Sequence, residues 1–323
     1  MRPFLTMLLL MLVALPGQAA VFRDEVLQRA YEQGRYDELE REARTRIGAE
    51  ALAAKTLATL ATTGKGRFEP LMTQAEQCVG LHPDAAVCHF LLGSVLGKDA
   101  QAGGALRGLR LVGRVRDSLA RAVQLDPGMF EARSALQMLL LIVPGIAGGS
   151  VDQARQLEMA VRDSQPEVAK LLRARLAAHA KRWDEAEREL LAIRLGEQRS
   201  FHTEVLNAWT GLARQWMKDG QHAKARARFE QLAQQLPQWA QPTYQLGRLA
   251  ADEGQHEEAL RLYERARGMG GAPLVPLDYR MGLAWLDLGD RDRARQLLQR
   301  FLQAGLGSQS NLDDASKRLR ELG

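Results

Sequence analysis

Three glycines recur at nearly equal spacing in the last third of the chain, and the residues around them recur with the same period. The first two glycines are 34 residues apart and the next two are 35 apart. Each has a small residue seven positions before it and an alanine five positions after it, with a large apolar residue four positions further on. These residues are Gly220, Gly254 and Gly289, then Ala213, Gly247 and Gly282, then Ala225, Ala259 and Ala294, and finally Phe229, Tyr263 and Leu298. A period of this length indicates an array of small structural units, and small residues beside large ones are typical of positions where two helices cross.

The composition favours helices over strands. Leucine, alanine, arginine, glutamine and glutamate dominate the 323 residues, whereas isoleucine occurs only at Ile47, Ile142, Ile146 and Ile193. Chains so poor in this β-branched residue are poor strand material and good helix material. The composition therefore argues against sheet-based catalytic folds, and the length allows two ordinary domains or one elongated array.

The segment between residues 209 and 237 resembles the tetratricopeptide repeat, with its large–Leu–Gly–aromatic first helix, glycine turn, Ala–aromatic second helix and closing proline. The matching positions are Trp209, Leu212, Ala213, Trp216, Gly220, Ala225, Phe229 and Pro237. The resemblance implies an all-α fold, a right-handed α-solenoid of antiparallel helix pairs. No pair can bury its apolar face alone, so neighbouring pairs stack into one continuous core.

The repeat pattern weakens toward the N-terminus but keeps its phase, which predicts about eight repeats over nearly all of the chain. We expect a signal peptide at 1–20, divergent repeats at 21–129, and central repeats at 130–205 that include an insertion with the sequence PGIAGGS. The repeats closest to the family pattern occupy 206–308, and a capping helix occupies 309–323.

The N-terminus has the layout of a secretory signal. A positive start is followed by an apolar run from Phe4 to Leu15 and then by the small residues of GQAA. This run is about a dozen residues long, too short to cross a hydrocarbon core of ~30 Å. We expect cleavage after Ala19 or Ala20, the alternative being a retained N-terminal anchor. The mature chain would have no transmembrane segment and would be periplasmic or secreted.

The two cysteines, Cys78 and Cys88, flank a His-Pro turn. An exported chain meets an oxidising compartment, where a disulfide between them is expected. The alternative is two buried free thiols that behave as small hydrophobic side chains.

No arrangement of residues typical of catalysis is found in the sequence. The six histidines form no HxxH or HExxH pair, and neither GxSxG nor a Walker-type phosphate loop occurs. The sequence therefore predicts a protein that is not an enzyme and has no metal and no cofactor. The formal net charge is +5, a mild bias that does not indicate a nucleic-acid partner.

Arginines recur at one position of the last repeats. The family resemblance implies that first helices line a concave groove and that the ninth repeat position points into it. Arg175, Arg214 and Arg248 occupy this position, followed by Leu283. Such a row would bind carboxylates bidentately; alternatively, the arginines pair with acids of adjacent repeats. Other polar or aromatic groove positions are Asn207, Thr210, Lys218, Tyr244 and Tyr279. The family's carboxylate-binding pattern of lysine and asparagine is not reproduced.

A second basic feature is an amphipathic helix expected at 105–123. Arg107, Arg110, Arg114 and Arg121 share its polar face. Such a face would contact anionic lipid or glycan weakly, although a solvated outer face is its commoner meaning.

We therefore expect a non-catalytic exported scaffold that binds a protein or peptide partner in its concave groove, in bacterial envelope assembly or secretion. The alternative hypothesis is a protein that associates with the envelope surface through the basic helix face.

Overall fold

The computed structural model describes residues 20–63, 68–196, 198–305 and 307–323. Within these ranges the chain is helical and contains no named strand; one isolated bridge joins Trp239 to Gly270. The expected signal peptide lies outside the described residues except for Ala20. No described helix is long and apolar enough to span a membrane.

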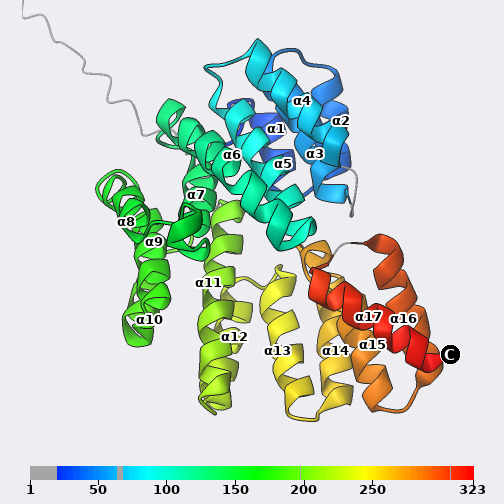
Figure 1. Cartoon of the computed structure of the whole chain (residues 1–323). Helices are drawn as coiled ribbons and strands as arrows, with labels where there is room; N and C mark the ends of the chain where they lie inside the picture. The colour runs from blue at the N-terminus through cyan, green and yellow to red at the C-terminus, as the bar shows by residue number, and fades with distance from the viewer. Residues whose placement is uncertain (1–19, 64–67, 197, 306) are drawn as a thin grey trace, which may run out of the picture.

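The helices follow one another in antiparallel pairs that stack side by side along a curved path (Figure 1). Eight pairs run from α1/α2 to α15/α16, and α17 follows them in the described part of the chain. In order, the helices are α1 (Glu25–Glu32), α2 (Tyr36–Arg44), α3 (Ala49–Thr62), α4 (Phe68–Leu81), α5 (Ala86–Ala102), α6 (Gly104–Leu125), α7 (Phe130–Ile142), the 3₁₀ turn η1 (Gly145–Ala147), α8 (Val151–Met159), α9 (Pro166–His179), α10 (Trp183–Leu191), α11 (Arg199–Lys218), α12 (His222–Gln235), α13 (Ala240–Asp252), α14 (His256–Arg267), η2 (Ala272–Leu274), α15 (Leu277–Asp287), α16 (Arg291–Ala304) and α17 (Gln309–Leu322).

The buried apolar residues form four clusters that succeed one another along the chain. The first extends from Val21 to Ala154 and the second from Phe130 to Leu249. The third and fourth belong to the last repeats. In the fourth, α17 packs against the last helix pair through Leu312, Ala315 and Leu322. Each helix pair thus buries its apolar face against its neighbours, and the predicted all-α solenoid is confirmed.

Small residues allow the two helices of a pair to cross closely. A Cβ at Gly247 would lie 2.6 Å from Cε1 of Tyr263, and one at Gly282 would lie 2.9 Å from Cγ of Leu298. Both distances are too short for any larger residue unless the facing side chain shifts. The large residue of the second helix therefore packs on the backbone of the first, as the repeat pattern predicts.

The repeat glycines end the first helix of the last three pairs in a left-handed conformation. Gly220, Gly254 and Gly289 have φ angles of 74°, 78° and 84°. The equivalent position between α9 and α10, five residues before Ala186, is occupied by Lys181, whose φ is 58°. A residue with a Cβ is strained in this region, whereas glycine is not.

Replacement of this lysine by glycine is expected to stabilise the protein. Lys181→Gly removes the Cβ strain and raises the free energy of unfolding by about 1 kcal/mol. Urea denaturation followed by circular dichroism measures the change as a higher midpoint. The reverse substitution, Gly220→Ala, is the control and should lower the midpoint by a comparable amount; a lower midpoint for Lys181→Gly contradicts the explanation.

One expected boundary differs in the structure. Helix α11 begins at Arg199, so one helix crosses the boundary expected between 205 and 206. The PGIAGGS insertion folds as η1 followed by a tight bend. A Cβ at Gly149 would lie 1.7 Å from the carbonyl oxygen of Val143, so this bend requires glycine.

The two cysteines lie on facing helices of adjacent pairs. Cys78 of α4 and Cys88 of α5 are joined by a disulfide, with their Cα atoms 5.3 Å apart. Both residues are buried in the first apolar cluster. The bond therefore links two consecutive repeats within their shared core.

Candidate functional site

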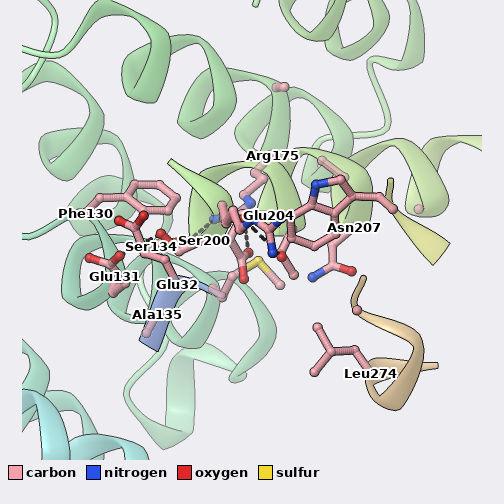
Figure 2. Close-up of a pocket in the computed structure, with 18 of the residues that line it drawn as sticks. Glu32, Phe130, Glu131, Ser134, Ala135, Arg175, Ser200, Glu204, Asn207 and Leu274 are labelled. Carbon is pink, nitrogen blue, oxygen red and sulfur yellow. Dashed lines mark hydrogen bonds and ion pairs between the residues drawn. The ribbon is translucent and has the colours of Figure 1, made fainter. Parts of the chain in front are cut away.

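A cavity of the described structure lies where the N-terminal, central and C-terminal repeats face one another, and we call it the central pocket (Figure 2). Its volume is about 1040 Å³. Side chains reach it from the turn between α1 and α2, from α5, α7, α9 and α11, and from the segment 269–274. A cavity of this size is large enough for a peptide segment or a small ligand.

An ion pair between a buried arginine and a half-buried glutamate lies in the middle of this pocket (Figure 2). The guanidinium of Arg175, a residue only 8% exposed, pairs with the carboxylate of Glu204 and donates to Oγ of Ser134 at 2.8 Å. Burial lowers the pKa of Arg175, and the charge of Glu204 opposes that effect. Three helices, α7, α9 and α11, are thereby tied together at one point.

A second carboxyl group, Glu131 at the start of α7, lies on another side of the pocket. Its Oε1 accepts a hydrogen bond from Oγ of Ser200 at 2.7 Å and another from Nε2 of Gln198 at 3.2 Å, and its Oε2 is buried without a partner among the described residues. Burial raises the pKa of Glu131 to about 7; the Ser200 hydrogen bond opposes this rise and the charge of Glu32 adds to it. Near neutral pH the group is thus about half protonated.

Aromatic and aliphatic side chains form much of the remaining wall. Trp239 is buried between α12 and α13, and the guanidinium of Arg199 lies 5.5 Å from the centre of its ring. Ile142 and Leu274, in contrast, are 70% and 60% exposed while lining the same pocket. Exposed aliphatic groups at the edge of a cavity are typical of a surface that is covered by a ligand or partner.

The structure does not unite the predicted groove residues in one row. Arg175 and Asn207 line the central pocket, but Arg175 is engaged by Glu204, as the alternative interpretation predicted. Asn207 accepts a hydrogen bond from Nε2 of Gln241 at 3.0 Å. Thr210 also has a partner within the protein, because its hydroxyl oxygen accepts a hydrogen bond from Nε2 of Gln245 at 3.3 Å.

The other groove residues lie away from this pocket, on α11, α13 and α15. Arg214 and Lys218 are exposed, and Arg248 is partly buried. Tyr244 packs on Tyr263 with ring centres 5.8 Å apart, and the hydroxyl of Tyr279 donates to Asp314 at 2.9 Å. Both tyrosines therefore contribute to the core rather than present open rings to a groove.

The predicted basic helix face is largely paired with acids. On α6, Arg107 donates two hydrogen bonds of 2.7 Å to Asp99. Arg114 pairs with Glu76 at 2.5 Å and Arg121 with Asp84 at 3.3 Å. Arg110 is the one of the four with no ion pair among the described residues. Local neutralisation of three arginines weakens the positive field that an anionic lipid or glycan would meet.

The sequence patterns did not indicate the main polar residues of the central pocket. Ser134, Glu131, Ser200 and Glu204 belong to no recognisable motif, and they converge only because the solenoid is curved. One signal was available: the helix at 130–142 carries buried polar residues at regular spacing, Glu131, Ser134 and Gln137. No group of three or more side chains able to hold a metal ion occurs in the described ranges.

A comparison with one solved structure agrees with this architecture. The structure of the human IFIT1 dimer with PPP-AAAA is similar, at 16% identity, with a TM-score of 0.52 and coverage of 92% of this chain and 72% of that chain. A crystal structure of a tetratricopeptide repeat protein from Parabacteroides merdae aligns at 14% identity, with a TM-score of 0.49 and coverage of 80% of this chain and 95% of that chain. No curated protein matches the chain in sequence.

The fold defines the class, an α-solenoid built from stacked helix pairs. A tetratricopeptide repeat family model matches residues 277–304, which are the segment of α15 and α16. Together with the repeat period, this match supports a tetratricopeptide repeat protein.

Proposed function

We propose that this protein is a non-catalytic scaffold that binds a protein partner by taking a peptide segment of that partner into the central pocket. The observation that carries the proposal is the cavity of about 1040 Å³ at the junction of the repeats, with exposed aliphatic groups at its edge. The fold supports it, because a preformed stack of helices loses little entropy when it binds a segment.

The composition of the pocket indicates what such a segment would carry. Apolar side chains would be covered by Ile142, Leu274 and the ring of Trp239. Backbone amides would find acceptors in the carboxyl groups of Glu131 and Glu32, which face the same space. An apolar segment with free backbone donors fits both properties.

We further propose that the scaffold is exported and acts in bacterial envelope assembly or secretion. The signal-like residues 1–20 and the disulfide between Cys78 and Cys88 support this location, because disulfides persist in oxidising compartments.

Site-specific photo-crosslinking in cells of the source bacterium tests both proposals. A photoreactive amino acid is placed at Asn207 or at Leu274, two positions that line the pocket from different elements. The same partner should be crosslinked from both positions. The pair of substitutions Ile142→Asp and Leu274→Asp, with the probe at Asn207, should lower the yield about tenfold. The mass of the purified chain shows whether residues 1–20 have been removed.

The matched control is Ile47→Asp, because Ile47 is 98% exposed and does not line the pocket. This variant carries the same kind of charge and should leave the yield unchanged. An equal loss in the control, or different partners from the two probe positions, contradicts the pocket assignment. A chain that retains Met1 contradicts the proposed export.

A further inference from the structure

Three arginines stand on successive first helices of the C-terminal repeats, outside the central pocket. They are Arg214 of α11, Arg248 of α13 and Arg280 of α15. The charges of Arg214 and Arg280 both act on Arg248, and together with burial, the largest cause, they lower its pKa. We call this group the arginine cluster.

No carboxylate forms an ion pair with any of the three in the described structure, although most arginines around them are paired. The guanidinium of Arg248 has only a weak hydrogen bond to Oε1 of Gln245, at 3.4 Å. Asp252, one turn further along α13, is exposed; its charge attracts Arg248 and acts to raise the pKa of Arg248, but the two groups form no ion pair. The guanidinium of Arg280 is hydrogen-bonded to Tyr244 and lies 5.3 Å from the centre of the Tyr279 ring.

Several hydrogen-bond donors of this region are buried and unused. Nε of Arg248, Nε of Arg280 and the hydroxyl of Tyr263 are buried and have no partner among the described residues. The Tyr263 side chain is fully buried beneath the cluster. Buried donors without acceptors cost free energy, and like charges held together add to that cost.

An oxyanion placed between the guanidiniums removes both costs at once. It supplies acceptors to the guanidiniums, whose planar donors can bind a carboxylate through two hydrogen bonds. Its negative charge also neutralises the repulsion that acts on Arg248. We propose that Arg214, Arg248 and Arg280 form a binding site for the side-chain carboxylates of an acidic peptide segment. The site is separate from the central pocket and does not depend on the function proposed for it.

Fluorescence anisotropy of the full chain at low salt tests this site with a labelled oligoglutamate peptide whose ends are both blocked. Oligoglutamate should bind and the matching oligoglutamine should not. Arg248→Gln and Arg280→Gln should each weaken binding about tenfold, because each removes a charged donor. Arg248→Lys keeps the charge but loses the planar donor pair, and its affinity should fall between wild type and Arg248→Gln.

The matched control is Arg261→Gln on α14. Arg261 is 73% exposed and paired with Glu258, and its loss changes the net charge by the same amount. Its affinity for oligoglutamate should equal that of wild type. An equal loss in this control, or no binding of oligoglutamate to wild type, overturns the proposal. Inorganic phosphate that displaces the peptide at equal concentration also overturns it, because the site would then serve a free anion.

Thermal unfolding without any anion distinguishes a binding role from a structural one. If the three arginines are held for a ligand, Arg248→Gln relieves repulsion and the melting temperature stays equal or rises. A lower melting temperature for this variant shows that Arg248 stabilises the stack and contradicts the assignment.

Discussion

Glu204→Gln is expected to lower the free energy of unfolding by about 3 kcal/mol, because it leaves the charge of Arg175 buried without a counter-ion. Glu204 is its only ion-pair partner in the described structure. The remaining hydrogen bond to Ser134 does not neutralise a guanidinium that is almost fully shielded from water. Urea denaturation at neutral pH measures the loss.

The double variant Arg175→Met with Glu204→Gln is the control. It removes the buried charge together with its partner, so its stability should exceed that of Glu204→Gln alone. If the single variant is as stable as wild type, the ion pair does not hold α9 against α11. If the double variant is the less stable of the two, the loss has a different cause.

The second large effect is a dependence of stability on pH that originates at Glu131. Burial raises its pKa from 4.5 to about 7, so between these values the folded state binds more protons than the unfolded state. The contribution of Glu131 is therefore fully present below pH 4.5 and is lost as the pH rises toward 7. Its size is about 3 kcal/mol.

Glu131→Gln removes this titration while keeping an oxygen that accepts from Ser200. Above pH 7 the variant should be more stable than wild type, and near pH 4.5 the two should be nearly equal. The other charged groups of the pocket, Glu32, Arg199 and the Arg175–Glu204 pair, are retained in both proteins. A constant difference between the two proteins at all pH values contradicts the assignment to Glu131.

The sequence was sufficient to predict the helix pairs, because the determinants of a repeat are local. The turn glycines adopt a backbone conformation that few other residues tolerate, and Gly247 and Gly282 leave room for one facing side chain each. Such requirements recur every 34 or so residues and leave a visible period. The strained lysine at 181 shows that the geometry persists where the residue pattern fails.

The candidate sites depend on contacts between repeats, and these leave no period. Arg280 is an example. It occupies the repeat position of Gln245, not the position shared by Arg214 and Arg248, so comparing one repeat position along the sequence does not find it. Arg175 shares that position, but Glu204 lies close enough to engage it. Whether an arginine is free or paired is decided by neighbours a full repeat away.

The succession of four apolar clusters has a consequence for cooperativity. Clusters that contact only their neighbours can open one at a time, so hydrogen exchange in such a chain reports several local unfolding reactions instead of one. The central pocket draws its walls from the first two clusters and from the segment 269–274, whose neighbours belong to the third. A segment bound in the central pocket would contact all three clusters. Binding would therefore make these partly independent clusters unfold together.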